Sequence, residues 1–505
     1  MATIIPRWEW RTFGTRFGPA EAAFAALQET GFQESDELYL LTGGRNNVKV
    51  RDNLMDIKVL REVDAEGLER WEPIMKARFP LSAEQASEVA GALGIAAPPA
   101  NDRTWTLDAF LETFAGPAGP IRPVAVHKSR VRYVVGGCTS EVSDVIADGH
   151  PVRTIAIESE DAAAVVAAVA SVRLAGFRNI SYPNGLAAAV AGRPDRYAVI
   201  DVGTHSVKFH LAEVSADGMW ETLVDRAEVT RLGEGLAESG SISEAALERT
   251  ITAIGAMATE ARRVDALAIA AVGTAGLRLA ANSDTVVAEI GRRTGVIVEV
   301  ISGEEESRLA YQAAVAGLGL GAGSAVVFDT GGGSSQFTFG AGGNVQERFS
   351  VNVGAASYTE RFGLDRAVGQ ARLEEALAAI SADLGRLDGR QPPDRLVGMG
   401  GAITNITAVA LGLSRYDPGK VQGFRLERTE VARQIAQYAR MDAEARRSIV
   451  GLQPKRAEVI LAGACIVRTV MERLSQSALT VSDRGLRHGV FAARFGSETS
   501  ARSVS

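Results

Sequence analysis

One short residue pattern occurs twice in this 505-residue chain, at residues 198–209 and again at residues 326–337. Each copy consists of an apolar run, an aspartate, a turn of small residues and a run in which polar and apolar residues alternate. The aspartates are Asp201 and Asp329, and glycine, serine and phenylalanine recur at equal distances after them. The pattern predicts a β-hairpin, and its repetition predicts a fold with two equivalent halves.

The tips of these two hairpins are suited to binding phosphate. Glycine lets an anion approach backbone N–H groups because no Cβ intervenes, and an aspartate before the tip can hold Mg²⁺ or orient water. Ordinary hairpin turns also contain Gly and Ser, but two matching copies favour a phosphate site. The predicted phosphate-binding residues are Gly203, Thr204, His205, Ser206 and Lys208 in the first copy and Gly331, Gly332, Gly333, Ser334 and Ser335 in the second.

The chain is too long for a single hydrophobic core, and its pattern changes near residue 190. Residues before this point form short alternating segments with Pro/Gly-rich loops, which indicate an α+β domain with an antiparallel sheet. Residues from 197 onward alternate between glycine-flanked strands and amphipathic helices, which indicates α/β architecture. We expect three domains, covering residues 1–190, 196–318 and 322–498.

Composition limits the function classes that the chain can serve. The formal net charge of −7 disfavours generic nucleic-acid binding, and no apolar run approaches the roughly 20 residues that span a bilayer. The first residues lack the basic-then-apolar order of a secretory signal. Cys138 and Cys465 stand far apart and match no metal-ligand spacing. These features predict a cytoplasmic protein with no specific nucleic-acid or membrane partner.

The hairpin pair resembles the superfamily of actin, sugar kinases and heat-shock chaperones, in which two such hairpins face each other across a phosphate cleft. Six further motifs resemble, in the same order, the exopolyphosphatase / guanosine-pentaphosphate phosphatase (Ppx/GppA) family. They lie at residues 231–236, 273–278, 301–308, 398–404, 455–463 and 481–489. The resemblance implies two α/β lobes of the actin-like ATPase (ribonuclease H-like) type, with the active site between them.

The same resemblance implies that the protein releases a terminal phosphate from inorganic polyphosphate or pppGpp with Mg²⁺ or Mn²⁺, and commonly acts as a homodimer. Glu306 would help activate water, with Glu305 as the reserve. Asp201, Asp329 and Glu306 would hold the metal, and Arg278 would counter negative charge. Without the resemblance, residues 304–306 would simply be an acidic helix start, and Arg278 a surface ion-pair residue.

Three residues depart from the family pattern. His205 and Lys208 stand where the family usually has Asn and Arg, and Gln336, the remaining candidate catalytic residue, replaces a glutamate. Glutamine cannot act as a base, so a weakly active or non-catalytic sensor of polyphosphate or (p)ppGpp is one alternative. An ATP-dependent kinase of the same superfamily is another, for which the turn at residues 398–402 would contribute to an adenosine pocket. The sequence does not choose between polyphosphate and pppGpp.

The N-terminal domain presents basic residues with a period of two, as on one face of a strand. In residues 128–134 three basic residues share one face, and Val131 and Tyr133 the other. Spacing and order resemble the CYTH, or triphosphate-tunnel, family, an antiparallel barrel whose basic residues point inward. The implied anion site contains Arg11, Lys49, Arg51, Lys58, Lys128, Arg130 and Arg132. One metal carboxylate of that family is missing, and a barrel with ordinary charged strand faces is the alternative.

Overall fold

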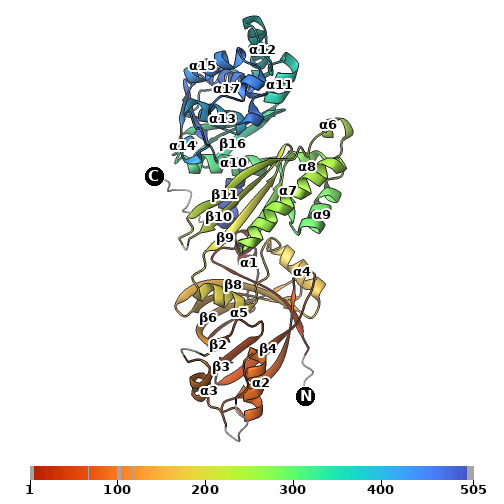
Figure 1. Cartoon of the computed structure of the whole chain (residues 1–505), viewed down its shortest axis with the longest axis vertical. Coiled ribbons are helices and arrows are strands. Elements are labelled where there is room, and N and C mark those ends of the chain that lie inside the picture. The colour runs from red at the N-terminus through yellow and green to blue at the C-terminus, as the bar shows by residue number, and fades with distance from the viewer. Residues whose placement is uncertain (1–4, 66, 99–103, 117–118, 216, 497–505) are drawn as a thin grey trace.

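The computed structural model describes residues 5–65, 67–98, 104–116, 119–215 and 217–496. Three bodies are stacked along the long axis of the molecule, namely an N-terminal barrel, a lobe built on a first sheet and a lobe built on a second sheet (Figure 1). No helix in these ranges has the length and apolar character needed to span a bilayer.

The barrel is closed and antiparallel, with strand order β1-β5-β4-β3-β2-β6-β7-β8. This confirms the predicted antiparallel barrel. Its strands are β1 (Arg7–Gly14), β2 (Gly31–Leu41), β3 (Asn47–Arg51), β4 (Leu54–Val63), β5 (Glu69–Arg78), β6 (Arg122–Val135), β7 (Cys138–Ala147) and β8 (His150–Ser159). Its helices are α1 (Pro19–Ala25), α2 (Ala83–Leu93), α3 (Leu107–Phe114), α4 (Ala162–Ser171) and α5 (Tyr182–Val190).

Side-chain alternation along the barrel strands separates an apolar outer face from a charged interior. On β6 the outward Tyr133 packs against α1 and α4, in a core that includes Phe24 and Val165. Another outer core joins β3 and β4 to α2 and α3. Helix α5 fills one end of the interior, where Tyr182 stacks on Tyr39 with ring centroids 4.9 Å apart.

The first lobe contains a five-stranded sheet with order β11-β10-β9-β12-β13. Its strands are β9 (Asp195–Val202), β10 (Ser206–Val214), β11 (Trp220–Val229), β12 (Ala268–Gly273) and β13 (Val298–Val300). One face is covered by α6 (Leu236–Ser239), α7 (Glu244–Arg263), α8 (Ala275–Leu279) and α9 (Ser283–Thr294). The opposite face is covered by α10 (Gly303–Gly317) and by the C-terminal α18 (Leu486–Phe495).

The second lobe contains a six-stranded sheet with order β16-β15-β14-β17-β19-β18. Its strands are β14 (Ser324–Thr330), β15 (Ser335–Ala341), β16 (Asn344–Val351), β17 (Arg395–Met399), β18 (Arg425–Glu427) and β19 (Ala478–Ser482). Its helices are α11 (Ala355–Phe362), α12 (Gln370–Asp383), α13 (Gly401–Ala410), α14 (Pro418–Val421), α15 (Arg428–Ala439), α16 (Ala443–Arg446) and α17 (Ile460–Arg473), with 3₁₀-turns η1 (Gly385–Leu387) and η2 (Pro454–Arg456). Helix α17 is almost wholly buried at the centre of its core.

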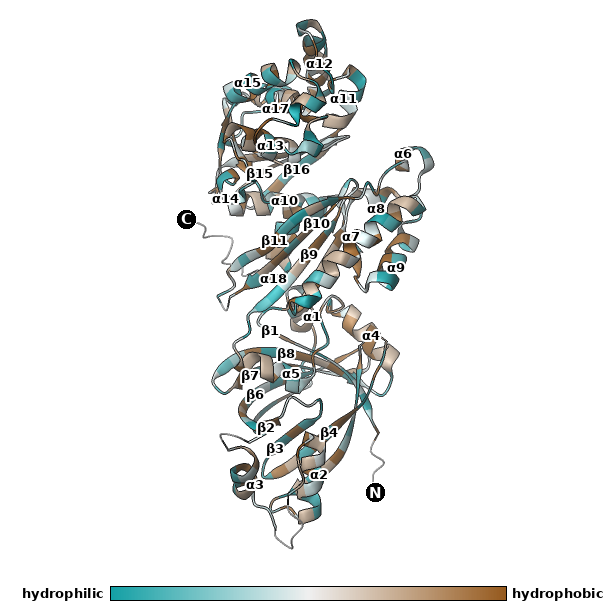
Figure 2. Ribbon diagram, viewed as in Figure 1, coloured by the Kyte–Doolittle hydropathy of each residue, from teal (hydrophilic) through white to brown (hydrophobic). Residues whose placement is uncertain are grey.

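The two sheets share one plan, in which an antiparallel three-stranded meander continues into parallel strands. Hydrophobic residues run along the strands of both lobes in Figure 2, as expected for sheets covered on both faces. The barrel is fixed to the start of β9, since the backbone N–H and hydroxyl of Thr15 both donate to Asp195 Oδ2 at 2.7 Å. Strand β9 therefore runs from the barrel interface to the first hairpin tip.

Candidate active site

The two repeated motifs form equivalent hairpins. Asp201 on β9 pairs with Lys208 on β10, and Asp329 on β14 pairs with Gln336 on β15. Each tip is closed by the same bond, from Gly203 N to Ser206 O at 3.1 Å in the first hairpin and from Gly331 N to Ser334 O at 2.9 Å in the second. The duplication read from the sequence is confirmed, and Gln336 is the structural counterpart of Lys208.

The first hairpin carries an ion pair at its base, between a buried aspartate and a partly exposed lysine. Lys208 Nζ donates to Asp201 Oδ2 at 2.9 Å, and Asp201 is only 1% exposed. The carboxylate of Asp201 is the main cause that raises the pKa of Lys208. The ammonium group is therefore held as a fixed positive charge beside the tip.

A loop behind the first hairpin, residues 230–235, holds the tip in place. Gly233 N donates to Thr204 O, and Arg231 N donates to His205 O, both at 2.9 Å. A Cβ on Gly233 would lie 2.3 Å from Thr204 Cγ2, so only glycine permits this approach. Partial burial, followed by the charges of Arg456 and Arg231, lowers the pKa of His205. The His205 imidazole is thus neutral near pH 7. The effect of Arg456 also shows that the first hairpin tip lies near a cation of the second lobe.

The second hairpin presents its three glycines, Gly331, Gly332 and Gly333, as exposed backbone. Ser335 is buried, and its hydroxyl donates to Val353 O at 2.6 Å. The Ser335 side chain therefore joins the hairpin to the following loop instead of pointing to the surface with the glycines. Gln336 is exposed.

Charged groups from both lobes converge on Asp329. Burial raises the pKa of this carboxyl group most, Lys208 and Arg456 lower it, and Glu306 and Asp201 raise it further. Gly400, with φ +90°, lies against the carboxylate, and a Cβ there would be 1.8 Å from Asp329 Oδ1. Asp329 thus sits between the N-terminus of α13 and the cations of the two lobes.

The acidic motif separates into two carboxylates with different partners. Glu306 lies in the first turn of α10, where its Oε2 accepts a 2.8 Å bond from Arg278 Nη1, and Arg278 also donates to Ile301 O at 2.9 Å. Glu305 instead accepts two bonds from Arg308 on its own helix, at 2.6 and 2.8 Å. Glu306 is therefore the glutamate oriented toward the charges around Asp329.

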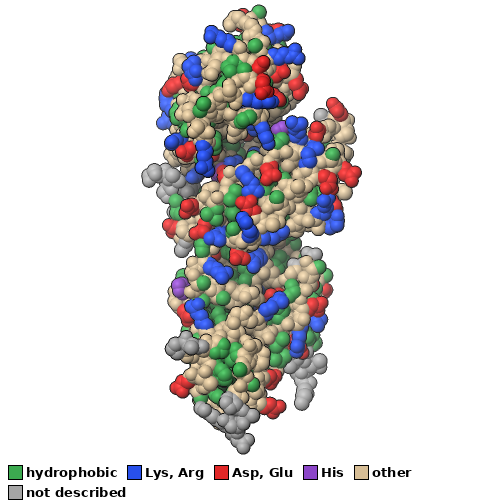
Figure 3. All heavy atoms as spheres, in the orientation of Figure 1, with side chains coloured by type: hydrophobic (Ala, Val, Ile, Leu, Met, Phe, Trp, Pro, Cys, Tyr) green, Lys and Arg blue, Asp and Glu red, His purple; other side chains and the backbone are tan. Residues whose placement is uncertain are grey.

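Two arginines near the site were not predicted as site residues. The charge of Arg456, in η2, lowers the pKa of Asp329. Arg456 also lies against the backbone of Gly401, where an added Cβ would be 2.5 Å from Arg456 Nη2. Arg348 on β16 reaches the start of α10, where its Nη1 atom lies 3.1 Å from the position that a Cβ on Gly303 would occupy. Arg456 belongs to the motif at residues 455–463, which could have identified it, whereas Arg348 has no local signal. Figure 3 shows Lys and Arg side chains on both sides of the junction between the lobes.

Among the described residues, no group of three or more His, Cys, Asp and Glu side chains is placed to hold a metal ion. Asp201, Asp329 and Glu306 therefore do not form a complete protein cage. Mg²⁺ is usually bound by one or two carboxylates together with substrate phosphates. One carboxylate at each hairpin, the buried Asp201 and the partly buried Asp329, fits that mode of binding.

The barrel interior contains six of the seven basic residues predicted there. Glu37, buried between them, pairs with Lys49 and Lys128 at 3.1 Å each. Glu141 pairs with Arg11 at 3.0 Å and Arg130 at 3.1 Å. The remaining two basic residues of the interior are Arg51 and Lys58. Arg51 lies 3.5 Å from Glu37, and the charge of Lys58 helps to lower the pKa of Glu9.

Arg132 is the exception, because it lies exposed near the end of β6 and donates to Gln33. Lys128 is the most deeply buried of the interior lysines, and burial followed by the charge of Lys49 lowers its pKa to about 7. The Lys128 ammonium lies 4.2 Å from the Tyr182 ring centroid. Glu37 and Glu141 are each shared by two or more of these cations.

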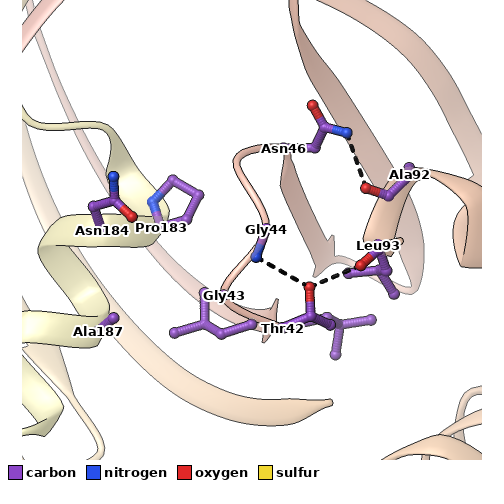
Figure 4. Close-up of a pocket in the computed structure, with 11 residues that line it drawn as sticks. Thr42, Gly43, Gly44, Asn46, Ala92, Leu93, Pro183, Asn184 and Ala187 are labelled. Atoms are coloured by element: carbon purple, nitrogen blue, oxygen red, sulfur yellow. Dashed lines mark hydrogen bonds between the residues drawn. The ribbon is translucent and has the colours of Figure 1, made fainter. Parts of the chain in front are cut away.

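A small cavity of about 30 Å³ lies at the α5 end of the barrel (Figure 4). Its polar groups are already paired, since Thr42 Oγ1 donates to Leu93 O at 2.8 Å and Asn46 Nδ2 donates to Ala92 O at 2.9 Å. The cavity is therefore a packing gap between α2 and α5 and does not belong to the site between the lobes.

Comparisons with known proteins concern mainly the part of the chain that forms the two lobes. The sequence profile of the Ppx/GppA phosphatase family matches residues 212–498. Exopolyphosphatase 2 of Mycobacterium tuberculosis is 28% identical over 318 residues, which cover 58% of this chain and 97% of that protein. The crystal structure of the Aquifex aeolicus Ppx/GppA phosphatase, type II variant, is 31% identical with a TM-score of 0.54, and the match covers 59% of this chain and 99% of that one. The chain therefore belongs to the Ppx/GppA phosphatase family.

Proposed function

We propose that this protein is a phosphohydrolase that releases terminal orthophosphate from inorganic polyphosphate, pppGpp or both. The observation that carries the proposal is the pair of equivalent hairpins, each with an aspartate before its tip, together with Glu306, whose charge acts on Asp329. The curated relative named exopolyphosphatase 2 supports polyphosphate as a substrate. Both candidate substrates end in a phosphoanhydride, so one site serves either of them.

The residues have separate tasks in the proposed reaction. Backbone N–H groups of the two glycine tips bind the phosphate oxygens, and Lys208 and Arg456 neutralise their charge. Glu306 orients water for in-line attack on the terminal phosphorus, since phosphoryl transfer needs positioning and charge stabilisation more than covalent help from the protein. Arg278 fixes the Glu306 carboxylate in that orientation.

Asp201 and Asp329 would hold Mg²⁺ or Mn²⁺ together with phosphate oxygens. The cation supplies further stabilisation of the charge that develops on the transferred group. Lys208 already pairs with Asp201, so binding of the cation requires that pair to loosen.

A second candidate function is a weakly active sensor of phosphate chains. It is favoured by Gln336, which occupies the register position opposite Asp329 and carries no charge. The kinase alternative has less support, since the turn at Gly400 receives the Asp329 carboxylate.

Purified protein is expected to release orthophosphate from long-chain polyphosphate and from pppGpp in Mg²⁺, and to stop when EDTA removes the metal. Release is measured with a colorimetric phosphate assay, and the ratio of the two rates gives the preferred substrate. Binding of either substrate without any release would reject the hydrolase and favour the sensor.

We also propose that the barrel holds an anionic phosphate chain, as its resemblance to triphosphate-tunnel domains implies. The cluster of interior cations around Glu37 and Glu141 supports this role. Strand β9 joins the barrel interface to the first hairpin, and its eight residues alone extend about 26 Å between them. A chain that reaches both sites must therefore be long.

Arg130→Gln is expected to weaken binding of long-chain polyphosphate about 10-fold or more, because a charge-assisted hydrogen bond contributes about 1.5–3 kcal/mol. Binding is measured by titration in EDTA, so that no turnover occurs. Arg122→Gln, on the exposed part of the same strand, is the matched control. Equal affinities for the two variants would reject a phosphate site in the barrel.

A further inference from the structure

The start of α11 is bonded to the tip of the second hairpin. Ala355 N donates to Gly331 O at 2.9 Å. Ala356 N and Ser357 N both donate to Gly332 O, at 2.8 and 3.1 Å. These are N–H groups of the first helical turn, which have no acceptor within their own helix. Carbonyl groups of the tip therefore satisfy the helix start, which is not itself an open anion site.

These bonds determine where the free N–H groups of the tip point. In a planar trans peptide the N–H lies opposite the C=O. The N–H groups of Gly332 and Gly333 share peptide units with the two bonded carbonyls, so they point away from α11. Neither N–H donates to a described residue, and both glycines are exposed. The tip thus presents two unbonded donors on the side opposite the helix.

Two residues of the helix start make this contact close. The Ser357 hydroxyl also donates to Gly332 O, at 3.3 Å. A Cβ on Gly354 would lie 2.3 Å from Gly332 O, so only glycine lets the helix start approach the tip. Gly354 has φ −134°, within the extended region that any residue adopts. The role of Gly354 is therefore to leave space, not to provide an unusual backbone conformation.

The second tip depends on its backbone donors more than the first. Residues 330–336 contain no Lys, Arg or His, whereas residues 202–208 of the first hairpin include His205 and Lys208. Hydrogen bonds in a chain polarise one another, and the N-terminus of a helix carries partial positive charge. The bonds from α11 therefore strengthen the N–H groups of Gly332 and Gly333 as donors to an anion.

We propose that the start of α11 is a positioning element for the hydrolysis. By holding Gly331 O and Gly332 O, it aims the N–H groups of Gly332 and Gly333 at one phosphate group of the substrate. Gly354 and Ser357 are positioning residues, because they act through the hairpin tip. This inference rests on the proposed phosphohydrolase function and deepens it, since it names residues outside the hairpin that set its second phosphate subsite.

The test observes the two tip N–H groups directly. The full-length protein is labelled with ¹⁵N-glycine and titrated with tripolyphosphate in EDTA, which removes the metal needed for turnover. The amide signals of Gly332 and Gly333 are assigned by their loss in Gly332→Ala and Gly333→Ala. In the wild-type protein both signals are expected to shift as the anion binds. Signals that stay in place in folded wild-type protein would overturn the inference.

Ala355→Pro removes one donor at the helix start. Proline is favoured at the first helical position, and the extended Gly354 before it is compatible with proline. Because Gly331 O then loses its bond, the N–H on the same peptide is no longer aimed at the phosphate. Affinity at the tip signals is expected to fall about 10-fold or more, as for one charge-assisted hydrogen bond. Gln370→Pro, at the first position of α12 after the extended Gly369, is the matched control and should keep wild-type affinity.

Ser357→Ala is a milder variant, which should fold normally because alanine is the stronger helix former. It removes only the hydroxyl bond to Gly332 O, so the affinity is expected to fall about 2- to 10-fold. If Ala355→Pro did not fold, Ser357→Ala alone would decide. Wild-type affinity in the folded variants would overturn the inference.

Phosphate release from polyphosphate in Mg²⁺ is measured on the same samples, and kcat/KM should fall by about the same factors as the affinity. Release by the wild-type protein without any response of the tip signals would overturn the inference alone. Tip signals that respond to tripolyphosphate in a protein that releases no phosphate would overturn the proposed hydrolysis and leave the tip as a phosphate-binding site.

Discussion

Glu306→Gln is expected to reduce phosphate release by about 10²–10⁴-fold, the range typical of losing a positioned acid–base group. Glutamine keeps the shape and one hydrogen bond to Arg278, but it cannot take a proton from the attacking water. Because Glu306 is a partly exposed residue of the first helical turn, the free energy of unfolding should change little. Initial rates with polyphosphate and thermal unfolding of the same samples measure the two effects.

Glu305→Gln is the matched control, since this carboxylate belongs to the same helical turn and is bonded to Arg308. Its rate should stay within about threefold of wild type, as expected for an exposed pair worth less than about 1 kcal/mol. A large loss in Glu305→Gln with normal rates in Glu306→Gln would exchange the roles of the two residues.

Gly400→Ala is expected to lower kcat by about 100-fold, because the added Cβ would occupy the place of Asp329 Oδ1 and displace that carboxylate by an ångström or more. The positive φ of this residue adds backbone strain, which costs on the order of 1–3 kcal/mol. The variant should therefore be both less stable and less active per folded molecule. Steady-state kinetics on protein shown to be folded by circular dichroism separates the two losses.

Gly412→Ala is the control that adds backbone strain without displacing a catalytic side chain. Gly412 follows the other end of α13, has φ +63° and has no atom within 4 Å of an added Cβ. It should lose stability alone and keep wild-type kcat. If Gly400→Ala also kept its kcat, the position of Asp329 would be irrelevant to the reaction.

The sequence by itself determined the features that depend on local order along the chain. An apolar run, an aspartate and a tip of small residues is a local hairpin pattern, so the duplication and the strand pairing after Asp201 and Asp329 were predictable. Alternation of side chains along a strand placed Lys128 and Arg130 opposite Tyr133, and this gave the charged interior of the barrel. The acidic residues 304–306 marked the start of α10 for the same local reason, and in the structure Ser302 caps that start.

Tertiary structure alone decided which groups meet across the chain. Three contacts join residues far apart in sequence, for which no periodicity gives a signal. They are the approach of Arg456 to Asp329, the packing of α18 on the first sheet and the two bonds from Arg487 on α18 to Asp225 on β11. The resemblance put Glu306 ahead of Glu305, but only the packed helix shows that Glu306 is the one bonded to Arg278, because neighbouring residues on a helix point about 100° apart. Local steric rules act within a few residues, whereas contacts between lobes depend on how whole sheets and helices pack.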